Sequence, residues 1–115
     1  MIAEVGAGAT VQVGVCGFRS TVQATRADRR HVSLAVESDC ETIGALAAAL
    51  TEHGPFDAFD EIDSRTESAL LAVVRAHLKG CCAGCAVPVG LFKAMQVAAG
   101  LALPRDVAIE LTKEQ

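Results

Sequence analysis

The sequence contains no tryptophan and no tyrosine, and four phenylalanines are its only aromatic residues. Hydrophobic residues still make up 51 % of the chain, so we expect an aliphatic core. Basic runs interleaved with aromatic residues are also missing, and the formal net charge is −4. A mildly acidic chain of this kind lacks the positive surface that binds nucleic acid or an anionic membrane. We therefore expect neither as a partner.

Targeting signals are missing as well. We expect no apolar run long enough to span a bilayer, and Met1 to Glu4 does not open a signal peptide. These features predict a cytoplasmic protein. At 115 residues we expect a single domain over residues 1–115, with residues 1–9 as a flexible lead-in of small side chains.

Three segments of alternating apolar residues predict strands. The first covers residues 10–16, the second covers residues 21–27, and the third contains Val32, Leu34 and Val36. Because the connections between them are short, an antiparallel meander is favoured. Further alternation at the C-terminus, at Val107, Ile109 and Leu111, predicts a last strand that joins the sheet edge.

Two capping-box patterns predict helix starts. Ser38 and Glu41 form the first, before a helix that His53-Gly54-Pro55 ends. Ser64 and Glu67 form the second, before a helix that ends at Gly80. The acidic stretch between these helices, residues 56–63, is expected to be a solvated connector with two or three apolar anchors among Phe56, Phe59 and Ile62.

A third helix is predicted to begin at Pro88 and to close at Gly100. The whole order fits a two-layer α+β fold. Its antiparallel sheet would contain the three-strand meander plus the C-terminal strand, with about three helices on one face.

The cysteines carry the clearest chemical signal. Cys81, Cys82 and Cys85 fall within five residues, flanked by glycines that permit tight bends. Cys82 and Cys85 have the C-x-x-C spacing that suits either one metal ion or a redox disulfide. Cys16 and Cys40 fall at the ends of predicted strands, so we expect the fold to bring all five thiols to one edge. In a reducing compartment, such cysteines indicate metal ligands or redox thiols rather than a disulfide framework.

The order Cys16-Gly17, Cys40, Cys85 resembles that of the iron–sulfur cluster assembly scaffold family (the IscU type, or NifU N-terminal domain). In that family a Cys-Gly precedes a β-hairpin, and the second and third cysteines each begin a helix. The resemblance spans roughly residues 16–100 and implies that the three thiols hold a cluster. The chain also looks like a small prokaryotic family of cysteine-containing proteins without assigned activity.

This sequence departs from the scaffold pattern at several positions. Phe18 replaces the family's aspartate after Cys-Gly, and Gly84 replaces the histidine before the third cysteine. The family's Leu-Pro-Pro-Val-Lys segment is absent. A fourth ligand would then come from Cys82 or Cys81.

Our leading hypothesis is a non-enzymatic protein that binds zinc or an iron–sulfur cluster through thiolates. Such soft ligands favour zinc or a cluster over hard cations. The ligands would be Cys16, Cys40, Cys82 and Cys85, with Cys81 as a spare or exchanging ligand. A scaffold role implies a cluster donor or acceptor protein as partner, and a homo-oligomer is compatible with it.

Two alternatives come from other classes of protein. The first is a thiol–disulfide protein that uses Cys82 and Cys85, although no aromatic residue precedes this motif. The second is a structural or interaction domain whose cysteines are simply reduced.

Overall fold

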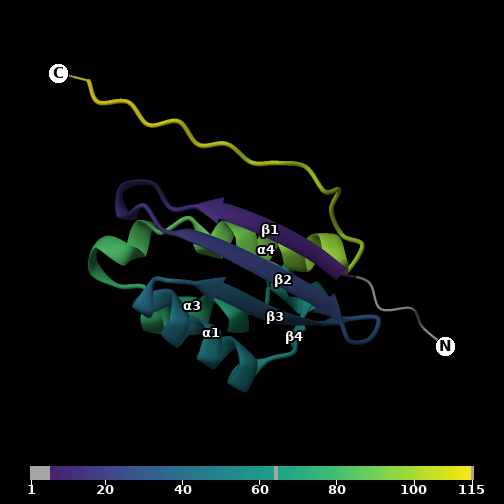
Figure 1. Ribbon diagram of the computed structural model, residues 1–115. Coiled ribbons are helices and arrows are strands. Elements are labelled where there is room, and N and C mark those ends of the chain that lie inside the picture. Colours follow the sequence, from purple (N-terminus) through teal and green to yellow (C-terminus); the bar gives the residue numbers. More distant parts are fainter. Residues whose placement is uncertain (1–5, 64, 115) are drawn as a thin grey trace.

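The fold is an α+β arrangement of a four-stranded antiparallel sheet and helices, which confirms the predicted fold class (Figure 1). The computed structural model describes residues 6–63 and 65–114. The strands follow each other in the sheet in chain order, as a meander: β1 Gly6–Gln12, β2 Arg19–Arg26, β3 His31–Ser38 and β4 Phe56–Asp57.

Four α-helices and two 3-10 helices complete the described chain. The α-helices are α1 Glu41–His53, α2 Ala58–Glu61, α3 Ala69–His77 and α4 Val87–Ala98. The 3-10 helices are η1 Gly14–Cys16, which connects β1 to β2, and η2 Gly80–Gly84, which precedes α4.

One face of the sheet carries the core. Val22 and Ala24 of β2 are buried, and the register places them beside Val36 and Leu34 of β3, which are also buried. The residues between them along each strand are largely exposed, as expected for an antiparallel sheet covered on one side. Helix α1 packs against β3 and against α3, while α4 packs across β1 and β2. Phe56 is the only aromatic side chain buried among the described residues, so the core is aliphatic as predicted.

Helix α4 approaches the sheet closely at Gly90. A Cβ atom added there would lie 2.7 Å from Cγ2 of Val11 and 3.6 Å from Cβ of Ala9. The absence of a side chain at Gly90 therefore sets the distance between α4 and β1.

The first strand begins earlier than predicted. Residues 6–9 belong to β1 and are not a flexible lead-in, while residues 1–5 lie outside the described residues. The predicted end of this strand is also wrong, because Gly14–Cys16 forms η1. Gly14 and Gly17 both have φ of +73°, a conformation that glycine adopts without strain and that turns the chain out of the strand.

The predicted C-terminal strand is absent from the described chain. Residues 103–114 have no regular secondary structure, and the fourth strand is β4, whose Phe56 and Asp57 pair with Val32 and His31. Residues 56–63 are therefore not a simple solvated connector, since they contain β4 and α2. Alternation at Val107, Ile109 and Leu111 indicates a strand-like pattern but does not provide a partner for it.

Both predicted capping boxes are wrong in detail. The N-cap of α1 is Cys40, and Ser38 Oγ instead accepts a hydrogen bond of 3.2 Å from the Cys40 N–H. Ser64 lies outside the described residues, and the N-cap of α3 is Ser68, whose Oγ accepts from the Leu71 N–H at 2.8 Å. Glu61 adds a second cap, because its Oε1 accepts from the Leu70 N–H at 3.0 Å.

The last helix lies in the most apolar part of the chain. Contrary to the sequence-based expectation, Gly80–Ala98 is long and apolar enough to cross a membrane, judged by length and composition alone. In the structure this stretch is divided between η2 and α4, and α4 buries residues such as Leu91 and Met95 in the core.

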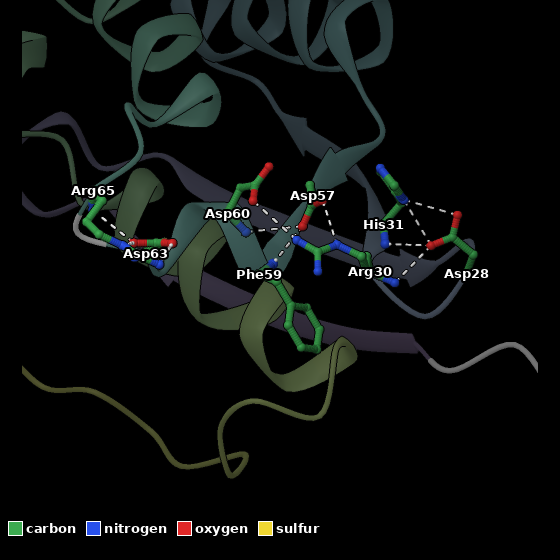
Figure 2. A network of polar contacts seen from close by, with 8 residues as sticks. All are labelled: Asp28, Arg30, His31, Asp57, Phe59, Asp60, Asp63 and Arg65. Atoms are coloured by element: carbon green, nitrogen blue, oxygen red, sulfur yellow. Dashed lines mark hydrogen bonds and ion pairs between the residues drawn. The ribbon is translucent and has the colours of Figure 1, made fainter.

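A polar network fixes β4 and α2 to the β2–β3 turn (Figure 2). Arg30 forms ion pairs with Asp57 at 2.8 Å and with Asp60 at 3.2 Å, and its guanidinium lies 5.0 Å from the ring centroid of Phe59. The Arg30 guanidinium lowers the pKa of Asp57 by hydrogen bonding to it. The network lies at the sheet end where β3 begins.

We expect Gly90→Val to lower the free energy of unfolding by about 1–3 kcal/mol, because the new side chain would overpack the α4–β1 interface. Gly44→Ala is the matched control, since a Cβ at this exposed helical position meets nothing within 4 Å. It should raise stability by about 0.5–1 kcal/mol through the higher helix propensity of alanine. Urea unfolding measures both, and equal stability of the two variants would contradict the close approach of α4.

We also expect stability to fall with acid at the β2–β3 turn. Hydrogen bonds from the Arg30 backbone N–H, the His31 side chain and the His31 backbone N–H lower the pKa of Asp28 from 3.8 to about 2. A carboxyl group with a lowered pKa stabilises the fold above its unfolded value and loses that contribution as the pH falls from about 4 to about 2. In urea unfolding at several pH values, Asp28→Asn should flatten this decline, whereas Glu52→Gln, at an exposed position of α1, should not. An unchanged pH slope in Asp28→Asn would contradict the assignment.

Candidate thiol site

The strand register brings two of the cysteine-bearing connections together. Gln12 pairs with Arg19, and Ser20 pairs with Ser38, so β1 ends, β2 begins and β3 ends at the same end of the sheet. Cys16 lies in η1 between β1 and β2, and Cys40 lies between β3 and α1. Both connections therefore leave from this end.

The third cysteine-bearing segment reaches the same end from the helical layer. η2 follows α3 and precedes α4, and it lies beside the β1–β2 connection and the start of α1 (Figure 1). Cys81, Cys82 and Cys85 come from this segment. We call the five cysteines of these three segments the thiol cluster: Cys16, Cys40, Cys81, Cys82 and Cys85.

Cys82 interacts with residues of two other segments. Burial raises the pKa of its thiol, and the neighbouring Cys81 and, more weakly, Cys16 raise it further. A hydrogen bond with the Thr42 side chain, in the first turn of α1, acts in the opposite direction. Cys82 therefore lies near both η1 and the first turn of α1.

The C-x-x-C motif is folded as a tight turn. The Cys85 N–H donates to the Cys82 carbonyl at 3.0 Å, and the Cys82 N–H donates to the Lys79 carbonyl at 3.2 Å. Two cluster members also flank helix starts: Cys40 is the N-cap of α1, and Cys85 comes directly before Ala86, the N-cap of α4. Helix N-termini carry partial positive charge, which favours an anionic group nearby.

Burial divides the thiol cluster into two groups. Cys40, Cys82 and Cys85 are half-buried and pack against the hydrophobic core, whereas Cys16 and Cys81 are exposed. All five thiols are free. Within residues 6–63 and 65–114, no group of three or more His, Cys, Asp or Glu side chains is placed to hold a metal ion together. The thiols thus share one end of the sheet without forming a closed coordination sphere.

Two hydroxyl-bearing residues at this end were not predicted from the sequence. Thr42 contacts Cys82 as described above, and Ser20 lies on the covered face at the start of β2. Ser20 is fully buried, and its Oγ has no hydrogen-bond partner in the described part of the chain. A buried hydroxyl without a partner costs about 1–3 kcal/mol, so serine is an unfavourable residue at this position. The sequence could have indicated the burial of Ser20, because this serine falls on the same face of β2 as Val22 and Ala24.

We expect Cys81→Ser to lower the pKa of Cys82, because the substitution removes the neighbouring thiol that disfavours a second negative charge. Iodoacetamide alkylation of Cys82, followed by mass spectrometry across pH 6 to 10, measures this change. Lys79→Ala, on the same turn, is the control for a general disturbance of η2. The pKa of Cys82 should be higher in this variant than in Cys81→Ser. An identical Cys82 titration in wild type and Cys81→Ser would contradict the proximity of the two thiols.

Comparisons with known proteins identify a family by sequence alone. A model of the family of unknown function DUF6951 matches residues 7–111, nearly the whole chain. Neither a curated protein nor a solved structure matches significantly. The match includes all five members of the thiol cluster, the sheet from Ala7 onward and most of the C-terminal segment. The chain therefore belongs to the DUF6951 family.

Proposed function

We propose that this protein binds a zinc ion or an iron–sulfur cluster through the thiol cluster and is not an enzyme. The observation that supports this most directly is the convergence of three separate chain segments, each carrying cysteine, at one end of the sheet. A metal ligand set drawn from distant parts of a chain requires this kind of convergence, whereas isolated buried cysteines do not.

The donor chemistry supports a soft metal. Thiolate sulfur selects zinc and iron–sulfur clusters and disfavours magnesium or calcium, which prefer oxygen. Cys16, Cys40, Cys82 and Cys85 would hold the metal, with Cys81 available to exchange. The N-terminal ends of α1 and α4 would stabilise the negative charge of such a site.

A metal that binds Cys82 would have to displace a proton, because the pKa of this thiol is raised. Closely spaced thiols disfavour simultaneous deprotonation until a cation compensates the charge, so binding would release protons and strengthen as the pH rises. The metal itself would supply the compensating charge. Burial of the Cys82 side chain would also limit exchange with water.

The outer ligands are carried by segments that can adjust. η1 and η2 contain no buried residue, and Gly14, Gly17 and Gly80 have positive φ. Little packing therefore opposes a small movement that brings Cys16 and Cys81 toward the half-buried thiols. We propose that metal binding closes these two segments over the end of the sheet.

The same arrangement is the basis for a scaffold or carrier role. Cys16 precedes β2, Cys40 caps α1 and Cys85 precedes α4, an order similar to that of the iron–sulfur scaffold family. Under this proposal the exposed Cys16 and Cys81 would exchange a cluster with a donor or acceptor protein. The protein would act in the cytoplasm, where thiols stay reduced.

A thiol–disulfide function of Cys82 and Cys85 has less support. Reactive redox thiols have lowered pKa values, whereas that of Cys82 is raised. Thioredoxin-like motifs also accompany parallel βαβ units, and the described sheet is antiparallel throughout. A purely structural or interaction domain remains the alternative if no metal binds.

We expect Cys16→Ser and Cys85→Ser to reduce metal retention similarly, because each removes one ligand of a shared site. Metal content and the visible spectrum of anaerobically purified protein measure this. His53→Ala, at the far end of α1, is the control and should retain wild-type metal content. Cys81→Ser should have a smaller effect than either ligand substitution.

Different outcomes would favour the alternatives. Equal metal content in wild type and Cys16→Ser would remove Cys16 from the site. If Cys82→Ser abolishes disulfide exchange and Cys16→Ser does not, the redox function is correct. If the wild-type protein binds no metal under any loading condition, the protein is a structural or interaction domain whose cysteines are reduced.

We also expect the fold to persist without metal. The buried aliphatic core of the sheet, α1 and α4 contains no cysteine, and three of the thiols pack only against its edge. Its burial does not require a metal, unlike that of a zinc finger. Chelation should leave far-UV circular dichroism nearly unchanged and lower the melting temperature moderately. The loss of amide protection should concentrate in η2 and its flanks, residues 80–88. Complete unfolding on chelation would indicate a structural metal and would contradict an exchangeable site.

A further inference from the structure

Strand β1 forms an unprotected edge of the sheet. Its register with β2 runs without a bulge from Gly6 opposite Thr25 to Gln12 opposite Arg19, and among the described residues no strand pairs with its other side. Natural edge strands are commonly protected by charged residues, proline or bulges, or are covered by another segment. β1 has no charged residue and no proline. Its outer edge is therefore open to pairing with another strand.

The C-terminal segment, residues 103–114, has the complementary features of a strand without a partner. It is extended and exposed, and large apolar side chains project from it: Leu103 is 74 % exposed, Val107 53 %, Ile109 66 % and Leu111 90 %. The last three alternate with Asp106, Ala108 and Glu110, a period typical of a strand with one apolar face. Regular exposure of large apolar residues indicates an interaction site.

A groove separates this segment from the rest of the molecule. It has a volume of about 860 Å³ and is lined by β1 and α4 on one side and by residues 103–107 and Ile109 on the other. Figure 1 shows the segment running past β1 from the end of α4 to the C-terminus. Val89 of α4, which is 40 % exposed, and Val97 lie in the wall of the groove.

A strand added at the β1 edge would pair with the free backbone groups of β1 and cover the apolar wall of the groove. Its apolar side chains would cover Val89 and Val97, and its polar side chains would extend the open face of the sheet that carries Thr10 and Gln12. Its backbone would meet the unpaired groups of β1. The pattern of the C-terminal segment matches each of these requirements.

We propose that the C-terminal segment of one copy adds to the β1 edge of a second copy, so that two copies exchange these segments. In the single chain the segment runs along its own β1 and still leaves the groove open. It extends the molecule to 55 Å, against 30 and 27 Å in the other directions. Twelve extended residues span about 40 Å, enough to reach a neighbouring domain. Reciprocal exchange would cover both edges and close the assembly as a two-fold dimer.

Sedimentation velocity of the full chain tests this proposal with two neighbouring substitutions. Ile109→Asp places a charge on the apolar side of the segment, and Ala108→Asp places the same charge on its polar side. Both positions are exposed, so neither substitution should disturb the fold of one copy. We expect a concentration-dependent dimer in wild type, at least roughly tenfold weaker association in Ile109→Asp, and little change in Ala108→Asp, because each dimer would lose two buried isoleucines.

Hydrogen exchange separates this dimer from closure within one chain. If wild type is monomeric at all concentrations while Ile109→Asp increases amide exchange in β1, the segment covers its own edge and the proposal is wrong. A dimer that responds equally to the two substitutions would show that another surface mediates association and would also overturn it. Protection of β1 that rises with dimer concentration in wild type, and not in Ile109→Asp, is the result that supports the exchange.

Discussion

The antiparallel register of β1, β2 and β3 determines which parts of this chain can meet. Pairing of Gln12 with Arg19 and of Ser20 with Ser38 gathers the β1–β2 connection and the β3–α1 junction at one end of the sheet. A shift of one residue in this pairing would also turn the buried face of the sheet outward, so core burial enforces the register. The positions of Cys16 and Cys40 therefore follow from the same hydrophobic alternation that forms the core, whereas the η2 cysteines reach this end from the helical layer.

The two ends of the sheet differ in chemistry. At the end where β3 begins, Arg30 holds β4 and α2 through ion pairs with Asp57 and Asp60. The opposite end has thiols in short segments, of which η1 and η2 contain no buried residue. Local stability should accordingly be lower at the thiol end. That difference would suit the proposed metal site, which would open and close while the core stays folded.

The sequence predicted the structure well where hydrophobic alternation coincides with burial. It predicted less where the local structure depends on contacts with a distant part of the chain. Val32, Leu34 and Val36 predicted β3 correctly, and the meander predicted that Cys16 and Cys40 would leave from one sheet end. Small residues concealed the start of β1. The N-cap of α3 is Ser68, and Glu61, which is distant in sequence, accepts a hydrogen bond from the same helix start. Contacts of Cys82 with Thr42 and the burial of Ser20 depend on how distant segments pack, which local pattern does not specify.

We propose that sulfur atoms from three chain segments share one metal. X-ray absorption at the metal edge, on zinc-loaded protein and on protein purified without oxygen, measures the ligands directly. The account predicts a shell of sulfur neighbours, four for zinc at about 2.3 Å, that loses sulfur in both Cys16→Ser and Cys85→Ser. A shell dominated by nitrogen or oxygen, or a sulfur shell unchanged in Cys16→Ser, would contradict it.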